Sequence, residues 1–204
     1  MLRKTRIAVF VSGGGTNLQA LLDAEKAGKL PHGEIALVIG SNPNAYGLER
    51  AKNFQKPTAM IRKKDLGSQE AFEAAIEKTL ADYEIDMIIL AGFLTILSGD
   101  FTKKWPERIL NVHPSLIPSF CGEGFYGLGV HEAALAKGVK VTGATVHFVN
   151  EIPDGGRILL QKAVEVQEGD TPEILQRRVM EQAEWLLLPQ AAEMVSRRIV
   201  EERG

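Results

Sequence analysis

The stretch that decides the fold class is Ile7-Ala8-Val9-Phe10-Val11-Ser12-Gly13-Gly14-Gly15-Thr16-Asn17. Its first five residues are apolar, as in a parallel strand that is buried on both faces. Glycines flanked by Ser and Thr follow, and then Leu18, Leu21 and Leu22 recur at helical spacing. A strand, a glycine loop and a helix in this order predict a βα unit that binds an anion, because the loop and the first helical turn present backbone N–H groups.

The same alternation continues along the chain. Apolar runs predict strands at 34–39, 58–61, 86–90 and 108–112, with helices at 46–53, 68–83 and 99–104. This order predicts an α/β protein with a doubly wound, mostly parallel sheet.

The pattern changes after about Val141. The runs Val141 to Val149 and Ile158 to Val166 predict a late antiparallel addition at one side of the sheet. Thr171-Pro172 then predicts the start of a long C-terminal helix that runs to about Glu201 and can kink at Pro189.

Composition limits the class of protein. The chain has 204 residues, 45% hydrophobic and 25% charged, and we expect one domain over residues 1–204. A net charge of −2 argues against a broad nucleic-acid or membrane surface. Cys121 is the only cysteine, so no internal disulfide is possible. The start of the chain is basic, and the apolar run that follows is too short for the core of a signal peptide. No apolar run is long enough to span a membrane. We therefore expect a cytoplasmic protein.

The glycine loop is best matched to a monophosphate. A nucleoside-triphosphate loop needs a Gly-Lys-Ser/Thr ending, and no lysine is present. A dinucleotide loop needs a third glycine, where Leu18 stands, and an acid after the second strand, where Gly40-Ser41 stands. Gly15, Thr16 and Asn17 open the helix and are the expected contacts. A tight turn without a ligand is the alternative.

Asn111 and His113 end the strand at 108–112. Residues two apart in a strand share a face, so both side chains point the same way. An amide donor can stabilise the oxyanion of acyl transfer, and an imidazole can move protons near neutral pH. The alternative is that they cap their own backbone. Asp154 follows the next strand, but nothing local shows that it reaches His113.

Three motifs together carry a family resemblance. Asn111-Val112-His113-Pro114-Ser115-Leu116-Ile117-Pro118, Thr145-Val146-His147-Phe148-Val149 and Asp154-Gly155-Gly156 resemble the folate-dependent formyltransferase family, and the likeness covers essentially the whole chain. The loop Ser12 to Asn17, Ala91-Gly92-Phe93-Leu94 and Glu184, five residues before Pro189, favour its branch in purine biosynthesis. We expect neither the further C-terminal domain of the methionyl-tRNA enzyme nor the N-terminal domain of the deformylase.

The resemblance implies a Rossmann-like formyltransferase fold, with a phosphate-binding half of about residues 1–90 and a folate and catalytic half of about 91–204. It implies transfer of the formyl group of 10-formyltetrahydrofolate to the amine of 5-phosphoribosylglycinamide. His113 would be the proton donor, Asp154 would raise its pKa and Asn111 would hold the formyl oxygen. The implied substrate contacts are Gly15, Thr16, Asn17, Glu181, Gln182, Ala183 and Glu184. The implied folate contacts are Gln69, Leu94, Thr95, Ile96, Leu97, Asn111, Asn150, Glu151, Ile152, Pro153 and Asp154.

Two departures from the family are apparent. Members often have arginine where Gln69 and Thr95 stand, so Arg62, Lys63 or Lys64 are candidates for binding the folate tail. The segment Ser119 to Val130 is longer than is common, and its glycines suggest a mobile flap.

Other functions remain open at this point. A deformylase-like hydrolase and a non-catalytic nucleotide-binding module are the alternatives to the transferase. Cys121 as a nucleophile lacks an evident base, and His113, Cys121, His131 and His147 match no zinc spacing, so we expect no metal. The expected partners are small-molecule substrates, neither nucleic acid nor membrane, and the chain is expected to be a monomer or a homodimer.

Overall fold

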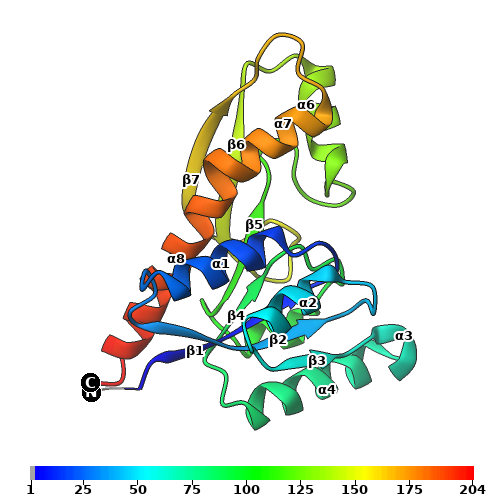
Figure 1. The fold of residues 1–204 in the computed structure, drawn as a ribbon. Coiled ribbons are helices and arrows are strands. Elements are labelled where there is room, and N and C mark those ends of the chain that lie inside the picture. Colours follow the sequence, from blue (N-terminus) through cyan, green and yellow to red (C-terminus); the bar gives the residue numbers. More distant parts are fainter. Residues whose placement is uncertain (1–2) are drawn as a thin grey trace.

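The computed structural model describes residues 3–204; Met1 and Leu2, part of the basic start, lie outside the described residues. Within these residues, seven strands form one sheet in the order β3-β2-β1-β4-β5-β6-β7 (Figure 1). The strands are β1 Thr5–Val11, β2 Gly33–Gly40, β3 Thr58–Met60, β4 Met87–Leu90, β5 Ile109–His113, β6 Val141–Phe148 and β7 Ile158–Glu165. The first five in chain order pair in parallel, and β6 and β7 are antiparallel. The expected fold class and the late antiparallel addition are therefore confirmed.

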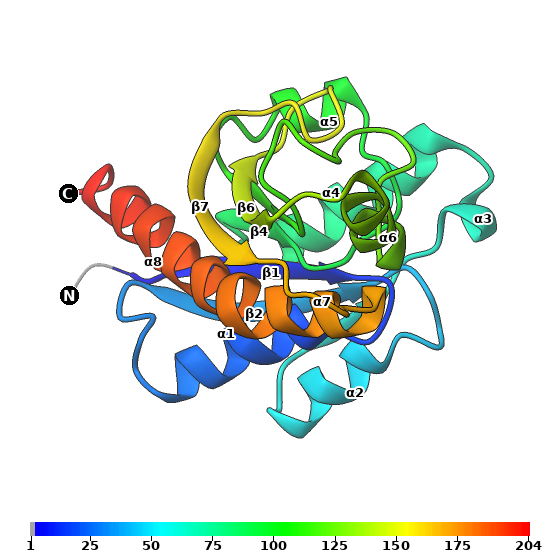
Figure 2. The ribbon, with the colours of Figure 1, turned by 90° about the horizontal axis from the view of Figure 1, so that it is seen from above.

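Helices cover both faces of the sheet (Figure 2). One face carries α1 Thr16–Lys26, α2 Tyr46–Asn53, α7 Pro172–Val179 and α8 Trp185–Glu201, and the other carries α4 Gln69–Asp82 and α5 Gly99–Lys103. β1 serves both sides: Ile7 and Val9 belong to the core under α1 and α8, whereas Ala8 and Phe10 belong to the core under α4. Alternation along a fully buried strand produces this division.

The direction of winding reverses at β1. Its neighbours in the sheet are β2 on one side and β4 on the other, so the loops after β1 and β4 diverge. Ligands of doubly wound proteins bind in such a crevice, at the carboxyl ends of the strands. Ser12 links the two loops at the base of this crevice. Its N–H donates to Gly92 O at 3.0 Å, and its Oγ accepts from Leu94 N at 3.0 Å.

Two helices were not expected from the sequence. α3 (Lys63–Leu66) is a single turn, and α6 (Leu128–Lys137) begins inside the segment predicted to be a flap. α6 lies beside α7, next to the part of the β6–β7 hairpin that extends beyond the other strands (Figure 1). Glycines at 122, 124, 127 and 129 obscure the helical pattern at its start.

The long C-terminal helix is interrupted earlier than predicted. α7 and α8 are joined by a π-helical segment, Met180–Glu184, in which Trp185 N–H bonds to Met180 O five residues back. Pro189 lies inside α8 rather than at the break. Wide turns of this kind are frequent at functional sites. No helix in the described part of the chain is long and apolar enough to cross a membrane.

Candidate active site

The glycine loop is held in an open, anion-ready shape. Gly15 has a φ of +69°, and a Cβ there would lie 2.5 Å from the Cα of Gly47, so any other residue would be strained and would force the backbone to shift. Gly47 N–H donates to Gly13 O at 3.1 Å, and Arg50 Nε donates to Gly14 O at 2.8 Å. Among the described residues no side chain caps the first turn of α1, which leaves its N–H groups for a ligand.

The π-helical segment packs against this first turn. Asn17 Nδ2 donates to Glu184 Oε2 at 2.7 Å, and Thr16 Oγ1 contacts Met180 Sδ at 3.7 Å. Glu184 is buried, and burial raises the pKa of its carboxyl to about 7 although the Asn17 hydrogen bond opposes this.

The four predicted contacts 181–184 do not all face the loop. Ala183 and Glu184 are buried, whereas Glu181 and Gln182 are exposed and Glu181 pairs with Arg177 at 3.3 Å. The glycine loop and Glu184 thus form one side of the site, which we call the Asn17–Glu184 wall. Glu181 and Gln182 lie on its solvent-exposed side.

A polar cluster lies at the end of β5. Asn111 stands opposite His147 of β6, and Asn111 Nδ2 lies 3.1 Å from His147 Nε2. His147 Nδ1 donates to Phe148 O at 2.9 Å, so its Nε2 is the ring nitrogen that faces Asn111. The interpretation of Asn111 and His113 as groups that only cap their own backbone is thereby weakened.

Asp154 joins this cluster from the turn after β6. Its Oδ2 lies 3.4 Å from His113 Nδ1, and its Oδ1 lies 3.4 Å from both His147 Nε2 and Asn111 Nδ2. Burial alone would raise the pKa of this carboxyl, but hydrogen bonds from His147 and Gly122 and the nearby imidazoles lower it overall. Asp154 also has a φ of +55°, a left-handed conformation that non-glycine residues adopt mainly where the surroundings enforce it.

Gly156 explains why the turn is so tight. A Cβ on Gly156 would lie 1.7 Å from Phe148 O, so the chain leaving the turn can approach the end of β6 only without a side chain. The Asp154-Gly155-Gly156 sequence therefore holds the carboxylate against the strand ends.

The segment predicted to be a flap lies on the cluster. His113 Nε2 donates to Phe120 O at 2.8 Å, and Gly122 N–H donates to Asp154 Oδ2 at 2.9 Å. Its backbone thus occupies one hydrogen-bonding position on each of the two predicted catalytic residues. Burial, and then the charge of Asp154, raises the pKa of the Cys121 thiol, which disfavours a nucleophilic thiolate there.

The predicted folate contacts meet in one crevice. The loop after β4 supplies Leu94 to Leu97 and the turn after β6 supplies Asn150 to Asp154, with Asn111 and His147 at the inner end. Gln69 lies at the rim and donates to Ile96 O at 3.1 Å. The cavity is about 130 Å³, below the roughly 300–1,000 Å³ of ligand pockets, so a ring system requires the two loops to part. Leu94, Ile96 and Ile152 are exposed at its edge.

The two predicted ligand sites remain separate. No hydrogen bond or ion pair within residues 3–204 joins the Asn17–Glu184 wall to the cluster at His113. The shared Ser12–Gly92 contact places their loops side by side. A ligand bound at the glycine loop would have to extend from α1 to the end of β5 to reach His113.

Comparison with known proteins gives the same picture. A family model described as formyl transferase matches residues 5–191. The chain belongs to the formyl transferase family. It is 41% identical to phosphoribosylglycinamide formyltransferase of Haemophilus influenzae, over 87% of this chain and 81% of that protein. It superposes on glycinamide ribonucleotide transformylase 1 of Symbiobacterium toebii with a TM-score of 0.88 and 42% identity, covering 95% of this chain and 88% of the other.

Some relatives are much longer. The chain is 44% identical to the trifunctional purine biosynthetic protein adenosine-3 of Gallus gallus over 95% of its own length, but it spans only 18% of that protein. The likeness to such relatives therefore concerns one part of them.

His147 is the residue of this formyl transferase site that sequence reasoning undervalued. Its alternation with apolar residues along the strand favours a hydrogen-bonded packing residue. It is buried and hydrogen-bonded, but it also touches Asn111 and Asp154. Only the β5–β6 register reveals this, because the two residues are 36 positions apart. Within the described chain, no group of three or more His, Cys, Asp or Glu side chains is placed to hold a metal ion.

Proposed function

We propose that this protein transfers the formyl group of 10-formyltetrahydrofolate to the amine of 5-phosphoribosylglycinamide, a step of purine biosynthesis. The observation that carries the proposal is the meeting of Asn111, His113 and Asp154 between a phosphate-ready loop and an apolar crevice. The names of the H. influenzae and S. toebii relatives support the same reaction.

The acceptor would be held by its phosphate. The N–H groups of Gly15, Thr16 and Asn17 at the start of α1 would bind the phosphate, with Glu184 against the rest of the molecule. The amine would then extend past the Ser12–Gly92 contact toward His113. Binding both partners in line supplies much of the acceleration of such a transfer.

The chemistry would proceed by direct attack. The neutral amine adds to the formyl carbon and forms a tetrahedral oxyanion, the amine loses a proton, the folate nitrogen gains one, and the bond between carbon and folate nitrogen breaks. Asp154 lies where it can stabilise positive charge on His113, so His113 would donate a proton and, with Asn111, stabilise the oxyanion. Asn111 must turn one N–H away from His147 or Asp154 to do so.

The folate would enter the crevice between Leu94–Leu97 and Asn150–Asp154. Within residues 3–204, no lysine or arginine lines that crevice. The candidates for the acidic tail lie at the start of α3: Arg62 pairs with Asp65, whereas Lys63 and Lys64 are exposed. Residues 1–204 would act as one cytoplasmic catalytic domain on small molecules, as a monomer or homodimer.

One assay separates this function from its alternatives. The absorbance of the folate product is followed with and without 5-phosphoribosylglycinamide. Turnover that needs the acceptor supports the transferase, release of formate without it indicates a deformylase, and no turnover indicates a binding module. His113→Ala and Asp154→Asn should each lower kcat by about 10²–10⁴-fold with little change in acceptor affinity. Unchanged kcat in either variant would refute the roles assigned.

A further inference from the structure

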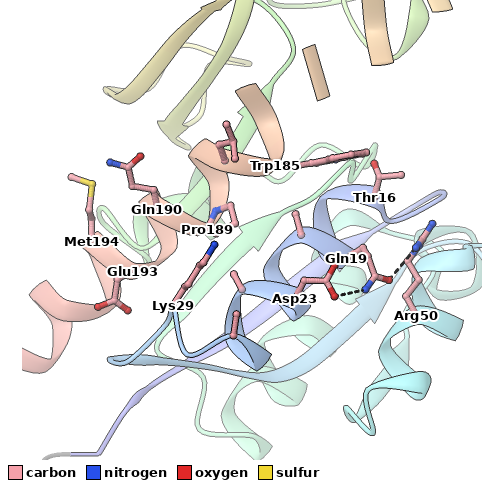
Figure 3. Close-up of a pocket in the computed structure, with 14 residues that line it drawn as sticks. Thr16, Gln19, Asp23, Lys29, Arg50, Trp185, Pro189, Gln190, Glu193 and Met194 are labelled. Atoms are coloured by element: carbon pink, nitrogen blue, oxygen red, sulfur yellow. Dashed lines mark hydrogen bonds between the residues drawn. The ribbon is translucent and has the colours of Figure 1, made fainter. Parts of the chain in front are cut away.

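A second cleft lies between α1 and α8, on the face of the sheet opposite α4 (Figure 3). Its volume is about 770 Å³, within the roughly 300–1,000 Å³ of sites for small molecules. It is lined from α1 by Thr16, Ala20 and Ala24 and from α8 by Trp185, Leu186 and Pro189, among others. The catalytic cluster contributes none of these residues.

Apolar side chains in the cleft remain uncovered. Leu186 is 53% exposed and Met194 is 44% exposed, although both belong to a helix that is otherwise packed on the core. The α1 side presents alanines, which leave space instead of filling it. Trp185 lies across one end of the cleft and points toward Thr16 (Figure 3). A ligand with a flat apolar body would remove these surfaces from water, which is favourable.

Lys29 is the cation of the cleft with no partner among the described residues, and Asp23, which also forms no salt bridge, accepts from Gln19 Nε2 at 3.0 Å. Glu193 is engaged by His32, and the Arg50 guanidinium donates to Gly14 O and Gln19 Oε1. Lys29 points into the cleft beside Pro189, and within residues 3–204 it forms no salt bridge (Figure 3). An anionic group on the ligand would complete this arrangement.

The cleft adjoins the loop that we propose holds the acceptor phosphate. Thr16 is the first residue of α1, and Trp185 directly follows Glu184, whose carboxylate accepts from Asn17 at 2.7 Å. A ligand touching Thr16 and Trp185 would shift the two sides of that hydrogen bond. Coupling between two sites through such shared elements is reciprocal.

We propose that the α1–α8 cleft binds a small aromatic carboxylate, with its rings against Trp185 and Leu186 and its carboxylate on Lys29, and that this ligand alters acceptor binding. The second part rests on the proposed function. The concave shape favours a small molecule over a flat protein surface.

Nuclear magnetic resonance of the tryptophan indole N–H groups tests the site, because the chain has only two tryptophans. Biphenyl-4-carboxylate should shift the Trp185 signal saturably and leave Trp105, which lies outside the cleft, unchanged. Lys29→Gln should weaken its binding about tenfold, but not that of the neutral biphenyl-4-carboxamide. Lys26→Gln, at the end of α1, three residues before Lys29 and outside the cleft, is the matched control. Leu186→Ser should weaken both ligands, whereas Leu66→Ser on α3 should weaken neither.

Equal effects of Lys29→Gln and Lys26→Gln, or equal shifts of both tryptophans, would overturn the site. So would a dimer, seen by sedimentation, that biphenyl-4-carboxylate dissociates, because the cleft would then bind a second copy. The affinity for 5-phosphoribosylglycinamide, measured by calorimetry, should change severalfold when biphenyl-4-carboxylate is present; an unchanged affinity refutes the coupling. If that acceptor does not bind at all, the proposed function fails, and the Trp185 titration still decides whether the cleft is a ligand site.

Discussion

Replacing Glu184 with glutamine should change how the stability of the protein depends on pH. The Glu184 carboxyl is buried beside Asn17, and burial raises its pKa from 4.5 to about 7. Between these values the folded protein keeps the proton and the unfolded chain has lost it. The unfolded chain then binds fewer protons, so the free energy of unfolding falls as pH rises from about 4.5 through 7.

The size of the effect follows from the two pKa values. Each pKa unit corresponds to about 1.4 kcal/mol, so a rise from 4.5 to about 7 lowers the wild-type free energy of unfolding by about 3 kcal/mol across this window. Glu184→Gln keeps the shape and cannot ionise, so it should not show this loss. The variant should therefore gain about 3 kcal/mol relative to wild type between pH 4 and pH 8.5.

Urea denaturation of both proteins at several pH values measures this difference. Titrations of other groups are common to both proteins and cancel in the comparison. Glu181→Gln, which removes an exposed carboxylate from the same π-helical segment, is the matched control. A difference between Glu184→Gln and wild type that stays constant within about 0.5 kcal/mol would refute the reasoning about burial.

Three further predictions concern the loop, a cap and the folate tail. Gly15→Ala should destabilise the protein by about 2–3 kcal/mol in thermal unfolding, because of its positive φ and its contact with Gly47; a smaller loss than about 0.5 kcal/mol would contradict this. Ser68→Ala should cost about 1 kcal/mol, since its Oγ caps α4; unchanged urea denaturation would count against the cap. Lys63→Gln with Lys64→Gln should raise KM for polyglutamylated folate about two- to fivefold and spare the monoglutamate; equal effects on both would refute a tail contact.

Most of the parallel half of the fold follows from local signals. Ile7 to Val11 and the glycines after it predict β1 and its loop, and both are found. Ser68 predicts the start of α4, and its Oγ accepts from Ala71 N at 3.1 Å. These features depend on residues close in sequence, where strand periodicity and capping chemistry are decisive.

The features that were missed depend on distant contacts. The π-helical segment at 180–184 packs against the first turn of α1. The residues at 180–184 themselves contain no sequence signal that predicts a wide turn. α6 follows a run of glycines, and its helical pattern becomes apparent only after Val130. The chain is helical to Glu201 as predicted, but the irregularity lies at Met180–Glu184 and not at Pro189, because a π-helical turn has no marker residue comparable to proline.

The sequence predicts only part of the candidate site, because the rest also depends on contacts between residues distant in the chain. The shared face of Asn111 and His113 follows from strand geometry alone. The approach of Asp154 was implied only by the family resemblance, since the turn that places it depends on the closeness of Gly156 to Phe148.

The polar cluster also shows that strand register itself determines where this chemistry can occur. Ile109 belongs to the core that Phe72 and Phe101 form on one face of the sheet. Asn111, two residues later on the same face, contacts His147 and Asp154 instead. A shift of one residue in the register of β5 would turn the side chains of Asn111 and His113 into the apolar core under α8. It would also bring Leu110 into the site. The cost of burying an amide and an imidazole without partners therefore opposes the very slip that would abolish the site.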